Sequence, residues 1–367
     1  MAQPNIRQLL NTSWTLHRLS PLHHGDECQY LLNNPTALNT YATRLRDQLT
    51  GDVLAGLQLG ISGAGAGGGA DEDDTLSKTG ALKTCTWETI SHLADGDDNY
   101  DSHEGSAGTR GILIVLEYEN ITYKAALLAA PSPSTTTTTQ SKGSTSLPLL
   151  LTKCPSPLRR TLIAFLSTNF DTYCSPLRLP SHAMCDGMDV YVNTFLASDD
   201  DTTTAIPGSS PRDILQDVVK DMQITLSLPP SVAPALRSLN INIPRAFFGE
   251  FLSNSPSSSS TSTSHLDSSS STSTANSPFF PSISAYLEKH LALKLDLRAP
   301  GKQPVRLSKI ACGGFVLGSE GRMKLVARSG QDDSGDDDGG DRLQLRAVEM
   351  LLRDILNRAV VGENVTK

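Results

Sequence analysis

The sequence predicts an α+β fold, with an N-terminal α/β lobe and a C-terminal curved antiparallel sheet flanked by helices. Segments with helical spacing of apolar residues are interspersed with segments in which apolar and polar residues alternate, which indicates helices and half-buried strands. The length of 367 residues suits about two domains. Between the patterned segments lie long stretches of Gly, Ser, Thr or Asp that lack the apolar side chains a core needs.

We expect the N-terminal lobe to span residues 1–196 and the C-terminal lobe to span residues 210–362. The low-complexity stretches are interpreted as disordered insertions at loop tips, because burial of their side chains cannot offset the entropy lost on ordering them. These insertions are expected at about residues 60–80, 94–109, 131–146, 253–278 and 329–341.

The N-terminal lobe begins with a predicted strand and a predicted helix. Bulky and polar residues alternate over Trp14–Leu19, and Ser20-Pro21 ends the strand. A helix is expected over Pro35–Leu49, because Asn34 can cap it and Pro35 suits the first helical position. Its apolar face consists of Leu38, Tyr41, Ala42, Leu45 and Leu49.

A hairpin and two further helices complete this lobe. The β-rich runs Gly111–Glu119 and Ile121–Ala129 predict a hairpin. One helix opens at Ser156-Pro157, and after an extended piece over Thr172–Leu179 a second is expected over Ser181–Leu196. We assign their apolar residues to the core: Leu158, Leu162, Phe165 and Leu166 in the first helix, and Met184, Met188, Tyr191, Val192 and Phe195 in the second.

The C-terminal lobe opens with a short helix from Ser210-Pro211 to Lys220, followed by strands over Met222–Leu228 and Leu239–Ile243. The most regular alternation lies at Lys289–Arg298, where every second residue is leucine, so we expect a half-buried strand there. Short strands with glycine-bearing turns then predict an antiparallel meander with one apolar and one basic face. They lie at Pro304–Ala311, Gly314–Leu317 and Arg322–Ala327.

The chain closes with an amphipathic helix over about Arg342–Val360, for which Asp341 is the expected cap. A helix of this kind packs one face against a core and leaves the other to solvent. Its apolar stripe consists of Val348, Leu351, Leu352, Ile355 and Ala359.

The charge distribution differs from the formal net charge of −8. Four acidic runs, Asp71–Asp74, Asp95–Glu104, Asp199–Asp201 and Asp332–Asp341, contain no Lys or Arg. Without them the chain has about ten more basic than acidic residues, which suits binding to nucleic acid or to an acidic partner. An ordinary solvated surface explains the same excess.

No catalytic, cofactor or metal motif is present. Gly63–Gly68 matches a dinucleotide-binding loop, but Asp71–Asp74 follows where phosphate would bind. The six cysteines form no C-x-x-C pair and are interpreted as reduced thiols. No apolar run is long enough for a membrane span, and a soluble intracellular protein is expected. We predict no enzyme and no cofactor; the alternative is an enzyme whose triad or metal site has no sequence motif.

Three stretches, Leu9–Leu22, Gly111–Leu128 and Leu147–Leu179, carry a family resemblance, together with the C-terminal strands and helix. They resemble the fungal members of the centromere protein L (CENP-L) family, which is an inner-kinetochore family. The resemblance implies a non-enzymatic nuclear subunit of the constitutive centromere-associated network that acts in chromosome segregation. It also implies a heterodimer with a CENP-N-like subunit, further inner-kinetochore partners, and a role in holding the centromeric nucleosome, with no membrane partner.

The resemblance implies that the C-terminal sheet is the pairing surface. The candidate interface residues are Leu291, Leu293, Leu295, Leu297, Val305, Leu307 and Phe315. Basic residues are candidates for contacts with DNA phosphates or an acidic partner, although each also suits an ordinary solvated position. These basic candidates are Arg159, Arg160, Lys294, Arg298, Arg306, Arg322 and Lys324.

Overall fold

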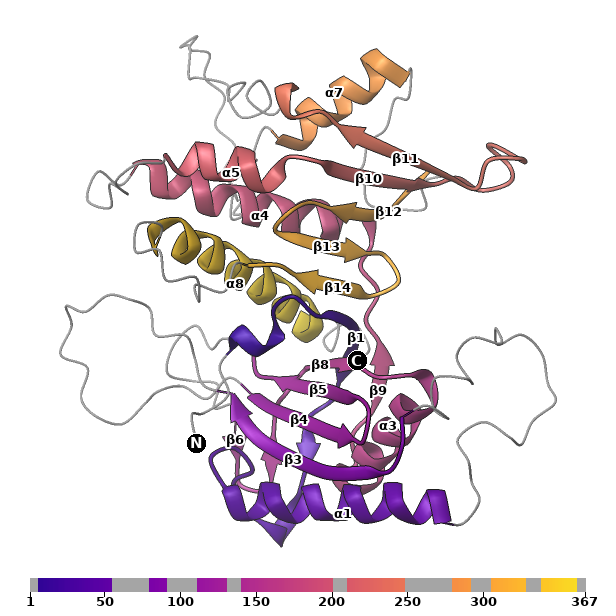
Figure 1. Ribbon diagram of the computed structural model, residues 1–367, viewed down its shortest axis with the longest axis vertical. Helices are drawn as coiled ribbons and strands as arrows, with labels where there is room; N and C mark the ends of the chain where they lie inside the picture. The colour runs from indigo at the N-terminus through magenta and orange to yellow at the C-terminus, as the bar shows by residue number, and fades with distance from the viewer. Residues whose placement is uncertain are drawn as a thin grey trace, which may run out of the picture. The chain divides into compact units, whose positions relative to one another are not determined.

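A computed structural model describes residues 6–54, 79–90, 111–130, 140–200, 210–247, 279–291, 305–327 and 338–361. Helices and antiparallel strands together form an α+β fold, which confirms the predicted class (Figure 1). The chain divides into two compact units: unit 1 is Met1–Leu177 with Ile355–Lys367, and unit 2 is Arg178–Asp354.

Unit 1 contains most of the N-terminal elements, with η denoting a 3₁₀ helix. They are η1 (Ile6–Leu9), β1 (Ser13–Leu19), β2 (Leu22–His23), η2 (Gly25–Glu27), α1 (Pro35–Leu54), β3 (Leu82–Ile90), β4 (Gly111–Tyr118), β5 (Thr122–Leu128), β6 (Gln140–Ser141), β7 (Ser144–Thr145), β8 (Leu149–Lys153), α3 (Ser156–Phe170) and β9 (Cys174–Pro176).

Unit 2 contains the helices and strands that follow. They are α4 (Ser181–Asp200), α5 (Pro211–Val219), β10 (Met222–Ser227), β11 (Ser238–Ile243), η4 (Arg245–Phe247), α7 (Phe279–Leu291), β12 (Arg306–Ala311), β13 (Phe315–Gly318), β14 (Arg322–Leu325) and α8 (Asp338–Val361), whose last residues belong to unit 1.

The strands of unit 1 pair antiparallel in the order β1–β8–β5–β4–β3, and β9 also pairs with β1. β8 lies between β1 and β5 and is buried on both faces, so Leu149, Leu150 and Leu151 follow one another without alternation. The short strands β2, β7 and β6 form a second sheet. The hairpin of β4 and β5 confirms the prediction for Gly111–Ala129.

An aromatic cluster occupies the core of unit 1. The ring of Tyr41 on α1 lies 4.5 Å from that of Phe170 on α3, and Trp87 on β3 lies 6.1 Å from Phe165. Both helices bury the apolar faces that the sequence predicts. Asn34 caps α1 as predicted, because the Ala37 N–H donates to Asn34 Oδ1 at 3.1 Å.

The strands of unit 2 pair antiparallel in the order β11–β10–β12–β13–β14. The last three strands of the predicted meander are confirmed as β12, β13 and β14, and β10 adds to them on one side. Helix α4 buries its predicted apolar face, with the Tyr191 ring 5.0 Å from Phe315 on β13. Gly314 is required at this contact, because a Cβ there would collide with the Tyr191 hydroxyl.

The division into units differs from the lobe boundary that we expected near residue 196. Helix α4 belongs to unit 2, where it contacts α5, α7 and β12. The end of α8 belongs to unit 1 instead. Contacts between residues far apart in the sequence decide this grouping, so composition and linker positions do not reveal it.

The predicted strand at Lys289–Arg298 is wrong for its first residues, because Lys289, His290 and Leu291 end α7. Residues 292–304 lie outside the described chain. The four-residue spacing of Ile283 and Leu287, both fully buried, favours a helix that runs to Leu291 over the alternation that begins there.

The predicted insertions lie largely outside the described residues, and the described parts require three corrections. Gln140–Thr145 is not an insertion but forms β6 and β7, with Gly143 at φ +79° in the turn. Thr79 is buried at the end of the insertion expected at 60–80. Asp341 lies inside α8, which begins at Asp338, so it is not the cap. An acidic residue in the first turn nevertheless complements the helix dipole.

Strand β3 is absent from the sequence prediction. Its pairing with β4 shifts register between Leu82 and Thr84. The bulge breaks the alternation of apolar and polar residues at the start of the strand, whereas after it the more buried Cys85 and Trp87 alternate with exposed residues.

Replacement of the cap of α1 tests the helix start. Asn34→Ala is expected to lower the free energy of unfolding by about 1 kcal/mol, because the Ala37 N–H loses its partner. Asn39→Ala, at an exposed position within the same helix, is the control and is expected to be neutral or slightly stabilising. Equal losses in urea unfolding of both variants contradict the capping role.

A buried histidine on β1 predicts sensitivity to acid. Burial and the nearby Arg159 guanidinium lower the pKa of His17 from 6.5 to about 4. The neutral form therefore favours the folded state, and stability is lost as pH falls from about 6.5 towards 4. Unfolding titrations of His17→Gln are expected to show a shallower loss over this range. A loss as steep as that of the wild type contradicts this role of His17.

Candidate functional site

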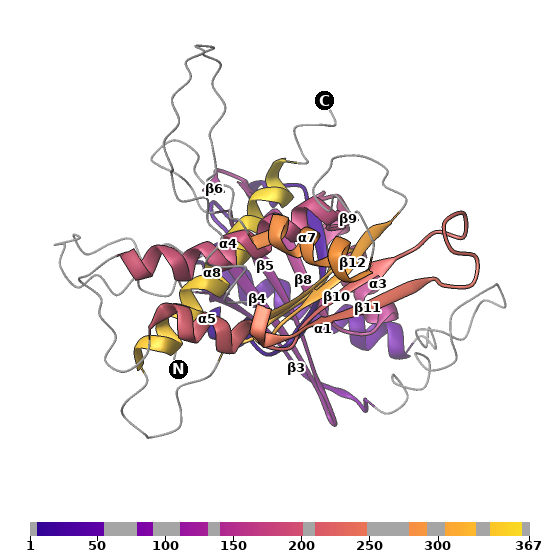
Figure 2. The same cartoon turned by 90° about the horizontal axis from the view of Figure 1, so that it is seen from above.

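The five strands of unit 2 present two chemically different faces. The apolar face is buried and consists of Met222, Ile224, Leu226, Ile241, Ile243, Leu307, Ile310, Phe315, Leu317, Met323 and Leu325. Helices α4 and α8 cover it, since a Cβ at Gly187 of α4 would touch Leu351 of α8 and Leu317 of β13. In the view of Figure 2 these two helices lie on the same side of β10 and β12. The apolar face is therefore occupied by the chain's own helices.

The opposite face carries four basic residues, Arg306, Lys309, Arg322 and Lys324, which we call the cationic face. The pairs Thr225–Lys309 and Ser227–Arg306 place the first two beside β10, and Val316–Lys324 and Gly318–Arg322 place the others beside β13. Arg306 and Lys309 are three residues apart, and they share a face only because a bulge in the β10–β12 pairing absorbs one residue.

Neutral polar side chains extend the cationic face onto β10 and β11. The Thr225 hydroxyl donates to Asn240 Oδ1 at 2.8 Å, and Gln223 Nε2 donates to Asn242 Oδ1 at 3.4 Å. None of the five described strands contains Asp or Glu. Cationic and amide side chains on strands without Asp or Glu have the chemistry that contacts phosphate groups without reading base sequence.

Strand β11 is the last strand in the order of unit 2, and among the strands of the described chain it pairs with β10 alone. Its register is continuous over six pairs, from Met222–Ile243 to Ser227–Ser238. Its sequence, SLNINI, contains no charge and no proline. Soluble proteins usually protect an edge strand with charges, prolines or bulges, so β11 has the features of an edge that pairs with another strand.

The structure separates the candidate interface residues. Leu307 and Phe315 are 1% and 0% exposed and belong to the buried face, whereas Val305 is half-buried just before β12. Leu291 is the last residue of α7. Leu293, Leu295 and Leu297 lie outside the described residues, as do the basic candidates Lys294 and Arg298.

The basic candidates fall into two groups. Arg306, Arg322 and Lys324 meet on the cationic face of unit 2. Arg159 and Arg160 lie on α3 in unit 1, where Arg160 is exposed and Arg159 Nη2 donates to Ser156 Oγ at 2.8 Å. Arg159 also lowers the pKa of His17, so it takes part in the electrostatics of its own unit.

The sequence analysis did not identify Lys309 or the β11 edge. Lys309 has the wrong parity relative to Arg306 for a regular strand, and only the bulge brings it to the same face. The sequence of β11 already shows the lack of charge and proline, but nothing in it shows that the strand is last in the order.

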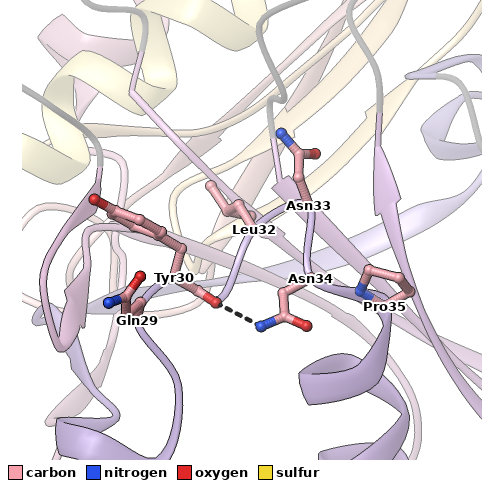
Figure 3. Close-up of a pocket in the computed structure, with 6 residues that line it drawn as sticks. All are labelled: Gln29, Tyr30, Leu32, Asn33, Asn34 and Pro35. Atoms are coloured by element: carbon pink, nitrogen blue, oxygen red, sulfur yellow. Dashed lines mark hydrogen bonds between the residues drawn. The ribbon is translucent and has the colours of Figure 1, made fainter.

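A hollow of about 550 Å³ lies before the start of α1 (Figure 3). It is lined by Gln29, Tyr30, Leu32, Asn33, Asn34 and Pro35, and the Asn34 amide donates to the Tyr30 carbonyl at 3.2 Å. The lining contains no carboxylate, imidazole or thiol. The hollow therefore lacks the groups of an acid–base or nucleophilic site.

A second hollow, of about 520 Å³, lies at one end of β10, β11 and β12. It contains ionisable groups, but Lys220 Nζ is paired with Asp217 Oδ1 at 2.6 Å. Burial raises the pKa of Cys312, which also lines it, from 9.0 to about 11. A thiol that stays protonated at neutral pH is not an activated nucleophile.

The closest approach to a nucleophile–base pair is in unit 1. Cys28 Sγ lies 3.3 Å from His24 Nδ1, and His24 Nε2 lies 3.1 Å from Thr145 Oγ1. Burial raises the pKa of Cys28 and lowers that of His24, so the pair stays neutral instead of forming the thiolate–imidazolium pair that catalysis needs. The three residues tie the η2 segment to β7.

The described residues also lack two other kinds of site. They contain no cluster of three or more His, Cys, Asp or Glu side chains that could hold a metal ion. Among the helices of the described chain, none combines the length and the apolar character that crossing a bilayer demands. The cationic face and the β11 edge are thus the features of the described chain that best suit an interaction.

Comparison with known proteins identifies the family of the chain. The centromere protein L family matches residues 8–360. No curated protein matches the chain significantly. The family match covers both units and all the strands described above. The chain therefore belongs to the centromere protein L family and is a protein of the centromere and kinetochore.

Proposed function

We propose that this chain is a non-enzymatic structural subunit of the inner kinetochore that forms a heterodimer with a CENP-N-like subunit. It acts in the nucleus, at the centromere, within the constitutive centromere-associated network, and helps to hold centromeric chromatin during chromosome segregation. The family match supports the setting. The observation that carries the pairing is the unprotected edge of β11 in the C-terminal sheet.

Pairing at this edge takes the form of strand addition. A strand of the partner that lies beside β11 satisfies the outward N–H and C=O groups of its backbone, which gives affinity without side-chain specificity. The neighbouring residues Ser238, Asn240 and Asn242 are exposed and uncharged, so their desolvation leaves no buried charge.

The edge replaces the apolar face of the sheet as the proposed docking element. Leu307 and Phe315 are buried under the chain's own helices, and docking on them would require α4 or α8 to move. Val305 and Leu291 remain candidates for contacts at the margin, together with Leu293, Leu295 and Leu297.

The cationic face is proposed to contact the phosphates of centromeric DNA. Arg306, Lys309, Arg322 and Lys324 lie on one sheet face, and its strands contain no carboxylate to oppose an anion. Such contacts release counterions and hold DNA without selecting a sequence. Lys294, Arg298, Arg159 and Arg160 stay candidates for additional contacts.

Prolines in β11 test the pairing. Successive residues of an edge strand direct their backbone N–H groups alternately towards the neighbouring strand and away from it. Asn240 and Ile241 are successive residues, so proline at one of them removes an N–H that points away from β10, and proline at the other removes an N–H that donates to β10. We call these the outward and the inward variant. The outward variant is expected to fold like the wild type but to bind the CENP-N-like subunit at least tenfold more weakly, as measured by calorimetry.

The inward variant is the matched control for this experiment. It is expected to lower the unfolding midpoint, because it breaks a bond of the β10–β11 ladder. If a folded outward variant binds its partner with wild-type affinity, strand addition at β11 is contradicted.

Charge removal tests the DNA contact. The double variant Lys309→Gln with Lys324→Gln is expected to bind duplex DNA more weakly than the wild type. The plot of the logarithm of the binding constant against the logarithm of the salt concentration is expected to be less steep by about 2, because two phosphate contacts are lost. Fluorescence anisotropy between low and physiological salt measures both quantities. Lys142→Gln with Lys153→Gln, two exposed positions in unit 1, is the control of equal charge; the same slope in both double variants argues against the cationic face.

A further inference from the structure

The connection between β10 and β11 ends in an exposed apolar segment, residues 229–236, which we call the apolar tip. Val232 and Leu236 are 49% and 46% exposed. The other large apolar side chains of comparable exposure in the described chain are Tyr30, Ile121 and Tyr173, all in unit 1. Figure 1 shows the tip extending beyond the ends of the two strands.

Backbone hydrogen bonds and prolines constrain the tip. The N–H groups of Val232 and Ala233 donate to the Pro229 carbonyl at 2.9 and 3.1 Å, and the Leu228 N–H donates to the Arg237 carbonyl at 2.9 Å. Prolines at positions 229, 230 and 234 further restrict the chain. A segment that is already ordered loses little entropy on binding, which favours its use as an anchor.

The composition of the tip differs from that of the hairpin that carries it. No residue from Leu228 to Leu236 is charged, whereas Thr225, Asn240 and their neighbours make the body of the hairpin polar on its exposed face. Exposed apolar area on this hairpin is thus confined to its end. Area of this kind contributes free energy when it is removed from water.

We propose that the apolar tip inserts into an apolar groove of the subunit whose strand adds to β11; this inference rests on the proposed function. The tip continues directly into β11, so a partner strand paired along this edge brings its own surface beside Val232 and Leu236. Strand addition supplies the register of the complex, and the tip supplies a side-chain anchor that a backbone ladder lacks.

A second copy of this chain is the less suitable occupant. Half of the residues that line the hollow at residues 29–35 carry amide side chains, and the lining of the hollow near Cys312 includes Asp217, Lys220 and Asp221. Burial of Val232 and Leu236 in either hollow would therefore desolvate amide or charged side chains, which costs free energy. The groove is therefore assigned to the partner, with Leu, Ile, Val, Met or aromatic side chains as its lining.

The experiment measures binding of the full chain to the purified CENP-N-like subunit of the same kinetochore. Val232→Ser with Leu236→Ser is expected to lower the affinity at least tenfold, mainly through faster dissociation. The unfolding midpoint is expected to stay at the wild-type value, because both side chains are already about half exposed. Ile121→Ser, which removes a 44% exposed side chain from the β4–β5 turn of unit 1, is the control and is expected to bind normally.

The outcomes separate the tip from the edge. If the tip variant binds like the wild type while the outward proline in β11 abolishes binding, the tip proposal is overturned and strand addition stands. If the wild-type chain does not bind this subunit, the proposed function fails and the tip proposal fails with it. If the tip variant changes only the self-association of the isolated chain in sedimentation, the occupant is a second copy and the proposal is overturned.

Discussion

The two-sided ladder of β10, β12, β13 and β14 is the constraint on which the interaction surfaces depend. Helices α4 and α8 seal its apolar face, with Tyr191 packed on Phe315 where Gly314 leaves room. Because that face is satisfied within the chain, what remains for other molecules is the opposite face and the outer edge. A bulge between β10 and β12 then sets which basic residues share the exposed face. The burial of the apolar face under α4 and α8 therefore leaves the basic residues on the opposite face of the sheet.

The two exposed features offer different kinds of contact. The edge of β11 presents backbone groups and suits another polypeptide, because hydrogen bonds along a strand need a partner of the same geometry. The cationic face presents Lys and Arg side chains on neighbouring strands and suits a polyanion such as DNA, because contacts with phosphates do not depend on the base sequence.

Unit 1 has a different character. Its aromatic cluster, its apolar strand β8 and the capped helix α1 form a well-packed body. Its thiols are mostly half-buried and their pKa values are raised by burial, as at Cys85 and Cys154, which suits structural positions. Its hollow before α1 carries amides and an aromatic ring.

The sequence by itself determined the elements with a regular period, the Asn34 cap, the strands of the meander and the family, because periodicity and capping are local properties. It failed where local patterns compete: leucine alternation suggested a strand at Leu291 where α7 continues, and a register shift concealed β3. Only the tertiary structure decided that Leu307 and Phe315 face inward, that Lys309 joins Arg306, and that β11 is an edge. Strand order and bulges arise from pairings between residues that are far apart in the sequence. Local sequence patterns therefore do not reveal which strand lies at the edge of the sheet.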